Sequence, residues 1–476
     1  MMPSATISMK RRTKIVCTLG PSVDSREKVK QLIEPGMNVA RLNCSHGNWD
    51  QKKRWIDWVR ECSPELSPVA ILVDLQGPKF RIGELPGGSA ELKQGQVVTL
   101  GPTGVAEIPI DQPEIILAMR ANSRLLLGDG EVELRILKKV DALFQARVVI
   151  GGTLFSRKGV TLVGKAFDTP ALTDKDRADA LMAINYGADF IALSYVKCAA
   201  DAQELCDFVH AINPRIAICA KIEMRQGIHD LHHILKVVDV VMVARGDMGL
   251  QMDIEDVPLM QKRIIHACST ACKPVITATQ MLESMIHNPR PTRAEATDVA
   301  NAILDGTDAV MLSGETASGQ YPIECVQTMS KIAERAESMY DHSRIIRDFD
   351  DRHSNGISRT DAIAHSVSDL ARCLKPQAIL TTTTSGQTPR LVSKFRPKEG
   401  ILCATWDEVT QRQLAIVWGV ETLKISPPVS TENTIQEAID EFSRMNRLKL
   451  GELVIITAGV PPGTPGNTNM ILTQVV

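Results

Sequence analysis

The chain repeats one pattern of hydrophobicity along most of its length. Short, β-branched apolar runs end in polar residues, and amphipathic segments of helical period stand between most of them. Eight such runs occupy residues 14–19, 39–45, 69–74, 190–195, 217–223, 238–247, 274–280 and 309–313. Near-continuous apolar strands that alternate with helices are typical of a parallel sheet covered on both faces. Eight units of this kind predict an α/β fold with a closed (β/α)8 TIM barrel.

The main alternative is an open, doubly wound parallel sheet. That fold is often marked by a G-x-G-x-x-G fingerprint where the first strand meets its helix. No such fingerprint opens a helix in this sequence. The closed barrel is therefore the favoured prediction.

One interruption breaks the alternation. After Asp74 no helix follows, and residues 78–168 are instead rich in glycine and short alternating strands. We expect a small all-β domain inserted in one βα loop. Loops at this end of a barrel carry the active site, so the insertion would be a lid.

The pattern restarts after the eighth unit. Residues 340–359 are charged and indicate a linker, and further strands and helices follow to the C-terminus. The predicted domains are the barrel (residues 1–77 and 169–340), the inserted β-rich lid (78–168) and a C-terminal α/β domain (341–476).

Composition excludes several classes of protein. With 476 residues and a formal net charge of -2, the chain lacks the field expected of a nucleic-acid binder. No apolar run reaches the roughly 18 residues of a membrane span, and no signal peptide is recognised at the N-terminus. We therefore expect a cytoplasmic protein with neither a nucleic-acid nor a membrane partner, whose 11 cysteines are free thiols.

Polar side chains gather where the apolar runs end. In a parallel barrel, residues at the carboxyl ends of the strands surround the mouth. The residues at these positions are Arg41, Asn43, Ser45, Asp74, Lys221, Glu223, Arg245, Asp247, Thr279, Ser313 and Glu315. Residues two apart on a strand share a face, so Lys221 and Glu223 are expected to point the same way.

These side chains suggest a metal and an anion. Glu223 and Asp247 end adjacent predicted strands, and two convergent carboxylates suit a hard cation such as Mg²⁺. Arg41 and Lys221 suit a phosphate or carboxylate. The alternative is a structural ion-pair network at the barrel mouth, because charged groups there must be paired or bound.

Two loops of small residues are candidate anion sites. Residues 246–249 read Gly-Asp-Met-Gly, a turn before a short helix whose amides can face an anion. Residues 381–388 join a predicted strand to a helix that starts near Pro389, and hydroxyls there suit a phosphate. The alternative for this second loop is ordinary N-capping by Thr388.

Eight motifs in order resemble the pyruvate kinase family. They occupy residues 13–21, 40–47, 74–81, 220–223, 242–249, 277–285, 291–295 and 311–317, and the match covers nearly the whole chain. The resemblance implies a barrel, an inserted β-rich lid, a C-terminal regulatory domain and a homotetramer. It also implies phosphoryl transfer from phosphoenolpyruvate to ADP, giving pyruvate and ATP in the last step of glycolysis, with Mg²⁺ or Mn²⁺ as cofactor.

The resemblance also implies roles for single residues. Arg41 resembles the phosphate-binding arginine, and Lys221 the lysine that stabilises the transferred phosphoryl group. Glu223 and Asp247 resemble the metal ligands, and Gly246 and Asp247 would offer amides to the substrate carboxylate. Thr279 matches the threonine near the enolate, and Ser313 stands where a proton-relay hydroxyl would lie. The expected nucleotide contacts are Asn43, Ser45, His46, Arg81 and Lys158.

Two departures from the family pattern concern potassium. In the family, Asn43, Ser45, Asp74 and a threonine form a K⁺ site, but here the threonine position is Leu75. An acidic residue linked to K⁺ dependence is replaced by Lys79. We expect the Lys79 ammonium to supply the charge of a bound K⁺, so that K⁺ is not required.

The loop with Thr383, Thr384, Ser385, Gly386, Gln387 and Thr388 resembles the family's effector phosphate loop. A sugar phosphate or AMP is the expected effector, and the partner loop near residues 461–469 departs from the better-known pattern.

Two other functions stay open from the residues alone. One is a barrel lyase that binds phosphoenolpyruvate or pyruvate with Mg²⁺, which would need neither a lid nor nucleotide contacts. The other is a metabolite-sensing module without activity, which the intact Lys221 and Glu223 argue against.

Overall fold

Eight parallel strands close into a barrel. The computed structural model describes residues 11–128, 130–165, 167, 169–342, 357–461 and 468–476. The strands are β1 (Lys14–Thr18), β2 (Met37–Asn43), β3 (Ala70–Asp74), β12 (Phe190–Leu193), β13 (Ala217–Ile222), β14 (Val240–Ala244), β15 (Val275–Ala278) and β16 (Ala309–Leu312). Their order is β1-β16-β15-β14-β13-β12-β3-β2, and β1 pairs with both β2 and β16. The predicted barrel is confirmed, and the open sheet is excluded.

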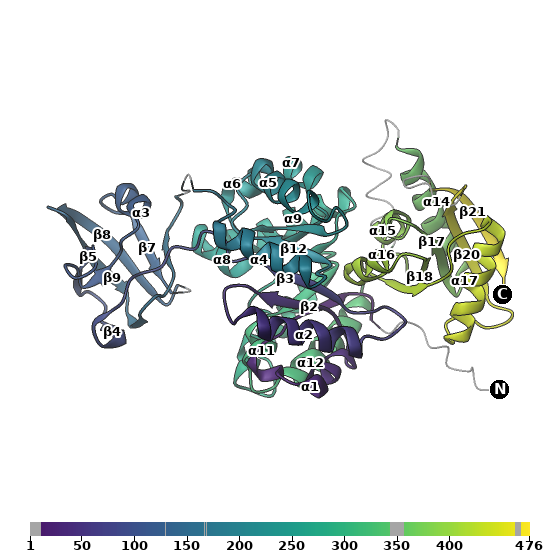
Figure 1. Cartoon of the computed structure of the whole chain (residues 1–476), viewed down its shortest axis with the longest axis horizontal. Helices are drawn as coiled ribbons and strands as arrows, with labels where there is room; N and C mark the ends of the chain where they lie inside the picture. The colour runs from purple at the N-terminus through teal and green to yellow at the C-terminus, as the bar shows by residue number, and fades with distance from the viewer. Residues whose placement is uncertain (1–10, 129, 166, 168, 343–356, 462–467) are drawn as a thin grey trace.

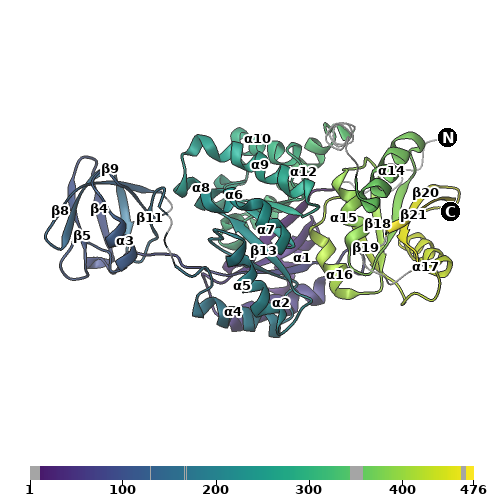
Figure 2. The same cartoon turned by 90° about the horizontal axis from the view of Figure 1, so that it is seen from above.

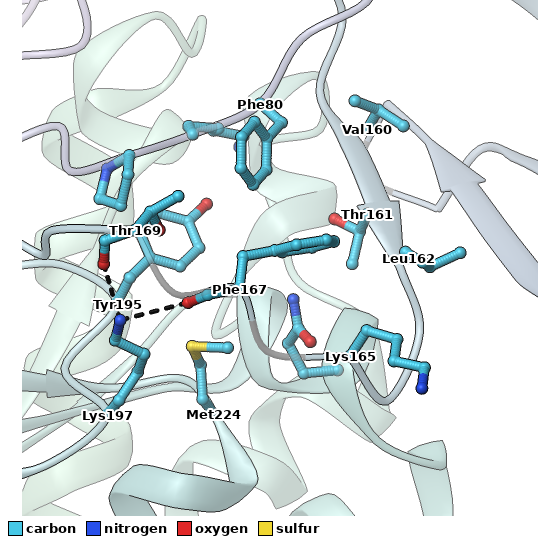
Figure 3. A pocket seen from close by; sticks show the side chains of 13 residues that line it. Phe80, Val160, Thr161, Leu162, Lys165, Phe167, Thr169, Tyr195, Lys197 and Met224 are labelled. Carbon is cyan, nitrogen blue, oxygen red and sulfur yellow. Dashed lines mark hydrogen bonds between the residues drawn. The ribbon is translucent and has the colours of Figure 1, made fainter. Parts of the chain in front are cut away.

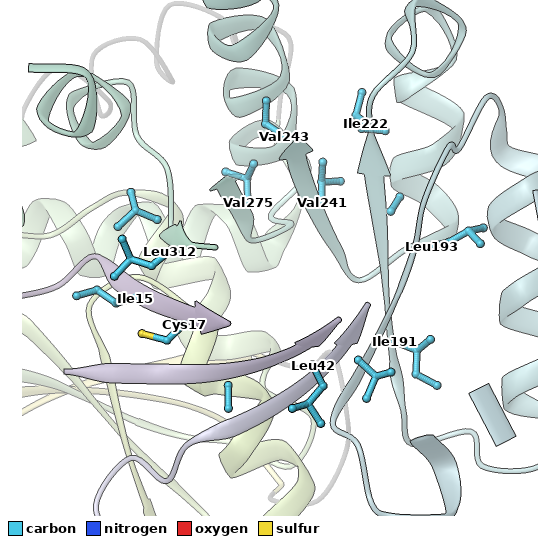
Figure 4. Packing of buried hydrophobic residues seen from close by; sticks show 14 of the residues in the cluster. Ile15, Cys17, Leu42, Ile191, Leu193, Ile222, Val241, Val243, Val275 and Leu312 are labelled. Atoms are coloured by element: carbon cyan, nitrogen blue, oxygen red, sulfur yellow. The ribbon is translucent and has the colours of Figure 1, made fainter. Parts of the chain in front are cut away.

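The barrel strands are buried on both faces, as their composition predicts. Ile15 and Cys17 of β1 point outward into a layer shared with the helices, whereas Val16 points inward. Figure 4 shows part of the outer layer, with Leu42, Ile191 and their neighbours between strands and helices. The surrounding helices are α1 (Arg26–Ile33), α2 (Trp49–Cys62), α4 (Asp174–Asn185), α5 (Ala199–His210), α6 (Arg225–His229), α7 (Leu231–Val237), α9 (Val257–Thr270), α10 (Arg293–Leu304) and α12 (Pro322–Glu337).

The insertion between β3 and α4 folds around its own core. A curled six-stranded sheet has the order β11-β7-β8-β9-β5-β6, beside a two-stranded sheet of β10 and β4. The elements are β4 (Ser89–Leu92), β5 (Val97–Gly101), β6 (Ile108–Pro109), α3 (Pro113–Ala118), β7 (Arg124–Leu127), β8 (Val132–Val140), β9 (Leu143–Ile150), β10 (Gly152–Phe155) and β11 (Val160–Leu162). The expected β-rich insertion is present, with one short helix that the strand pattern did not predict.

The C-terminal segment forms a second α/β sheet. Its strands β17 (Ala378–Thr382), β18 (Gly400–Thr405), β19 (Val420–Lys424), β20 (Leu453–Gly459) and β21 (Thr468–Val475) have the order β19-β18-β17-β20-β21. Only the edge strand β21 runs antiparallel, to β20. The accompanying helices are α14 (Arg359–Leu374), α15 (Gln387–Lys394), α16 (Glu408–Gln413) and α17 (Thr431–Arg444). Most of the predicted linker, residues 343–356, lies outside the described residues, as does position 168 at the predicted lid boundary.

The two added parts lie at opposite ends of the barrel (Figures 1 and 2). Arg396 donates to Asp308 Oδ1 at 2.8 Å, and Arg412 Nε donates to Asp189 Oδ1 at 2.7 Å. These aspartates directly precede β16 and β12, so the C-terminal domain packs under the amino ends of the strands. The insertion follows the carboxyl end of β3, which leaves it beside the mouth.

Two further expectations concern the whole chain. All cysteines are free thiols. Among the described residues, no helix combines the length and the apolar character that a membrane crossing needs.

Candidate active site

A single buried carboxylate joins two cations at the mouth. Arg41 donates from Nε to Asp74 Oδ2 at 2.8 Å, and its Nη1 donates to Thr18 Oγ1 at 2.8 Å. Lys221 Nζ lies 3.4 Å from Asp74 Oδ1. Burial alone would raise the pKa of Asp74, but the charges of Lys221 and Arg41 hold that pKa below its usual value. The ends of β1, β2, β3 and β13 therefore meet at one ionised group.

Lys221 is held on three sides. Its Nζ donates to Ser194 Oγ at 2.8 Å and lies 2.9 Å from Glu223 Oε1. Burial alone would lower the pKa of Lys221, but the carboxylates of Asp74, Glu223 and Asp247 outweigh burial and raise it. The ammonium is therefore a permanent positive charge at this position.

Glu223 is fully buried beside Lys221 at the barrel mouth. Its Oε2 accepts a hydrogen bond from the Tyr195 amide at 2.8 Å, which fixes the side chain. Its Oε1 lies 2.9 Å from Lys221 Nζ, so the two side chains form an ion pair. Burial raises the pKa of Glu223 to about 7, with Lys221 opposing the shift and Asp247 adding to it. The charge of Asp247 thus acts on Glu223, and their shared role as metal ligands stays a prediction.

Asp247 reaches this cluster in an unexpected way. The sequence placed it at a strand end, in a turn before a short helix, but β14 ends at Ala244 and helix α8 (Arg245–Gln251) begins at once, so Asp247 lies in the first turn of the helix itself. An acidic side chain is favoured there by the helix dipole. Its Oδ1 lies 3.9 Å from Lys79 Nζ, which comes from the linker that leads from β3 into the insertion.

Arg245, which the sequence also placed at the mouth, turns away from it. Its guanidinium is buried, pairs with Asp298 at 2.7 Å and donates to the carbonyl of Thr279 at 2.6 Å. This contact supports the backbone of Thr279, whose φ is +70°. Arg245 is therefore a structural support of the loop and not part of the mouth.

Thr279 and Gly246 contact each other directly. The Gly246 amide donates to Thr279 Oγ1 at 2.7 Å, and that hydroxyl donates to the Ala278 carbonyl at 2.6 Å. The Gly246 amide, which the sequence analysis assigns to a substrate carboxylate, therefore has a protein acceptor in this arrangement. A ligand that binds the Gly246 amide would have to replace Thr279 Oγ1 as its hydrogen-bond acceptor.

Ser313 carries a free hydroxyl group at the end of β16. Its buried Oγ has no hydrogen-bond partner, while its amide donates to Glu315 Oε2 at 2.7 Å. Glu315 is buried and also accepts from the Leu282 amide at 3.1 Å. Glu315 therefore holds the loop backbone, and Ser313 is left with hydrogen-bonding capacity to spare.

The expected nucleotide residues divide between barrel and insertion. Asn43 Oδ1 accepts from the Ser45 amide at 2.9 Å, which shapes the loop after β2. Burial lowers the pKa of the adjacent His46, and the charge of Arg81 lowers it further, so Arg81 of the insertion lies near this loop. Lys158 pairs instead with Glu131 at 3.2 Å, within the insertion.

The candidate effector loop is compact. Thr383 Oγ1 accepts from the Gly386 amide at 2.9 Å, and Thr388 Oγ1 shares a hydrogen bond of 2.8 Å with Thr468. Thr384, Ser385 and Gln387 are at least partly exposed. N-capping by Thr388 is wrong, because Gly386 is the N-cap of α15 and no side chain caps this helix. Residues 462–467, in the partner loop named above, lie outside the described residues.

The carboxylates fit a divalent cation that keeps other ligands. Within the described part of the chain, no three acidic, histidine or cysteine side chains gather as a metal site. Mg²⁺ commonly binds through one or two carboxylates plus water and substrate oxygens. Glu223 and Asp247 supply two carboxylates whose charges interact, which meets that smaller requirement.

Sequence reasoning missed two residues of this site. Ser194 ties Lys221 to the Leu75 carbonyl, to which its Oγ donates at 2.8 Å, and Thr18 supports Arg41. Both follow apolar strand runs, and a polar residue at that position is the only signal the sequence offered.

Comparisons with known proteins agree with this fold. The family model described as the pyruvate kinase barrel domain matches residues 10–326, and the pyruvate kinase alpha/beta domain matches residues 361–473. A curated pyruvate kinase of Geobacillus stearothermophilus is 45% identical over 476 residues, covering 98% of this chain and 81% of the relative. One of Sporosarcina psychrophila is 42% identical over 475 residues, covering 98% and 80%. Pyruvate kinase 2 of a Synechocystis strain is 42% identical over 489 residues, covering 99% and 80%.

The pKa of Glu223 predicts how metal binding depends on pH. A cation needs the ionised carboxylate, so affinity for Mn²⁺ should fall as the pH drops through about 7, and binding should release a proton from Glu223. Calorimetric titration in buffers of different ionisation enthalpy measures that proton. Glu223→Gln should weaken binding and remove the proton release, and an unchanged release in this variant would contradict the assignment.

Proposed function

Since the chain belongs to the pyruvate kinase family, we propose which of its residues perform each part of the reaction. The protein is a phosphotransferase that moves the phosphoryl group of phosphoenolpyruvate to ADP. The observation that carries the residue assignment is the meeting of Arg41 and Lys221 on Asp74, beside Glu223.

Arg41 and Lys221 stabilise the phosphoryl group in transfer. A loose transition state spreads negative charge over three equatorial oxygens, so fixed positive charges lower the barrier. Both cations are nearly buried and both are oriented by Asp74, which limits the reorganisation needed during the reaction. Mg²⁺ or Mn²⁺ on Glu223 and Asp247 would neutralise further charge on the phosphoryl oxygens.

Thr279 and Ser313 contact the enolate that remains after phosphoryl transfer and assist its protonation. Ser313 Oγ is buried without a partner, and Thr279 Oγ1 is already linked to the Gly246 amide. Binding of the substrate carboxylate to the amides of Gly246 and Asp247 would release the Thr279 hydroxyl toward the enolate. Ser313 then passes on the proton that converts the enolate into pyruvate.

The nucleotide lies between barrel and insertion. Asn43, Ser45 and His46 offer contacts from the barrel side, whereas Arg81 and Lys158 approach from the insertion.

We assign the domains as residues 1–77 and 169–340 (barrel), 78–168 (lid) and 341–476 (C-terminal domain). The lid excludes water during phosphoryl transfer. A barrel lyase would need none of these contacts, and a module without activity would not need Lys221 and Glu223.

Lys79 replaces a bound K⁺. The oxygens of the family's K⁺ position are engaged within the chain: Asp74 binds Arg41 and Lys221, and Asn43 accepts from Ser45. Leu75 offers only an apolar, buried side chain at this place. The Lys79 ammonium, 3.9 Å from Asp247, supplies the positive charge.

Regulation and assembly complete the proposal. A sugar phosphate or AMP binds the loop 383–388, where Ser385 and Gln387 are exposed at the start of α15. A homotetramer is supported by exposed apolar side chains, among them Ile254 and Leu259 near α9 and Val475 on β21. We keep the cytoplasm as the expected compartment.

Replacing Lys221 tests the catalytic assignment. Lys221→Met should lower kcat by about a thousandfold, because it removes an oriented charge from the transition state, while phosphoenolpyruvate still binds. A lactate-dehydrogenase-coupled assay and fluorescence titration measure the two quantities, with circular dichroism to verify folding. The control is Lys53→Met, which removes an exposed lysine paired with Asp57. Unchanged turnover would remove Lys221 from the mechanism.

Potassium independence is tested with tetramethylammonium as the only monovalent cation. We expect equal activity with and without K⁺ in the unsubstituted protein. Lys79→Glu should need K⁺, because an acidic group then replaces the ammonium near Asp247. A large activation of the unsubstituted protein by K⁺ would refute the role of Lys79.

The effector loop is tested by a panel of sugar phosphates and AMP, with inorganic phosphate as reference. Ser385→Asp places a negative charge at the exposed loop and should raise the half-activating concentration at least about tenfold by repelling a phosphate. Ser385→Asn has similar size without the charge and should respond nearly as the unsubstituted protein does. Equal responses of the two variants would place the effector elsewhere.

A further inference from the structure

One ammonium holds the linker that returns from the insertion to the barrel. Lys197 Nζ donates to the Thr169 carbonyl at 2.7 Å and to the Phe167 carbonyl at 3.3 Å, and Figure 3 shows both bonds from one side chain. Thr169 and Phe167 lie in the second of the two linkers between insertion and barrel. Lys197 is half-buried, so these charge-assisted bonds are partly shielded from water.

Lys197 itself is fixed to the barrel. Its amide donates to Asp201 Oδ2 at 2.8 Å, and the Cys198 amide donates to the same oxygen at 3.3 Å. Asp201 lies in the first turn of α5, where its charge is favoured. The backbone of Lys197 is therefore fixed to helix α5 by these hydrogen bonds.

The same loop holds the catalytic cluster at its other end. Ser194 accepts from Lys221, and the Tyr195 amide donates to Glu223. The outgoing linker also rests on this loop, because a Cβ at Gly77 would lie 2.9 Å from both Ser194 Cβ and Tyr195 Cδ2. Residues 194–197 thus contact the catalytic lysine, the candidate metal ligand and both linkers.

An aromatic contact joins the two linkers above this loop. The rings of Phe80 and Phe167 meet edge to face with centroids 5.1 Å apart, and both line a small cavity (Figure 3). The Val160 amide donates to the Phe80 carbonyl at 3.1 Å, so the outgoing linker is hydrogen-bonded to β11 of the insertion. A shift of either linker would therefore move Lys158 and Arg81 relative to the mouth.

We propose that Lys197 is a positioning residue for phosphoryl transfer, which sets where the inserted domain stands over the nucleotide by holding its return linker to the loop that orients Lys221 and Glu223. The inference rests on the proposed roles of Arg81 and Lys158 at the nucleotide. Lys197 touches neither substrate nor reacting atoms. It acts through the linker, so its loss affects nucleotide use more than phosphoenolpyruvate binding.

The test compares three variants of the full-length enzyme. Lys197→Met removes both bonds and should raise the KM for ADP about tenfold, the order expected for a lost charge-assisted hydrogen bond. The Kd for phosphoenolpyruvate should change little, and hydrogen exchange of residues 157–165 should become faster. Lys197→Arg keeps the charge and should restore most of the ADP affinity. The matched control is Lys165→Met, a lysine that lines the same cavity.

Each outcome decides the matter. Equal ADP kinetics in Lys197→Met and Lys165→Met overturn the proposal, as does a lower thermal midpoint with unchanged KM, which indicates a structural role alone. If Lys197→Met does not fold, Lys197→Arg and Lys197→Gln make the same comparison. A silent Lys197 variant beside an inactive Lys221→Met rejects only this inference, whereas an active Lys221→Met rejects the proposed roles at the mouth.

Discussion

The negative charge of a carboxylate buried in a barrel mouth must be balanced by nearby positive charges, and this requirement determines how the active site is arranged. Asp74 is almost inaccessible to solvent. Removing its charge from water costs about several kcal/mol, and nearby cations and hydrogen bonds must offset that cost. Arg41 and Lys221 supply that compensation from two other strands. In return, Asp74 holds two cations close together that would otherwise repel each other. The site therefore has its positive charge in place before any substrate arrives.

The barrel makes this convergence possible because strand registers fix which ends meet. Asn43 pairs with Asp74 and Thr18 with Arg41, which brings the polar ends of β1, β2 and β3 to one level. The C-terminal domain packs at the opposite end, through Arg396 and Arg412. The C-terminal domain and the mouth are thus separated by the length of the strands, whereas the insertion lies beside the mouth.

Much of this arrangement was predictable from the sequence, for a physical reason. Strands buried on both faces must be nearly continuous in apolar residues, so the polar residues that end them are conspicuous, as at Lys221 and Glu223. The predictions that were wrong concern features that depend on contacts between segments far apart in the sequence. The run through Asp247 looked like strand, yet a helix begins at Arg245, whose guanidinium is drawn to Asp298 and the Thr279 carbonyl. Lys197 gave no signal, because a lone lysine after a strand is usually solvated.

The most direct test of the account replaces Asp74 by asparagine, which keeps the shape of the side chain and removes its charge. Without that charge, Arg41 and Lys221 lose the group that orients both. The account predicts that kcat falls by about a hundredfold or more in a protein whose circular dichroism still shows the folded barrel. A kcat within about twofold of the unsubstituted enzyme, a difference of less than about 0.5 kcal/mol, would contradict it.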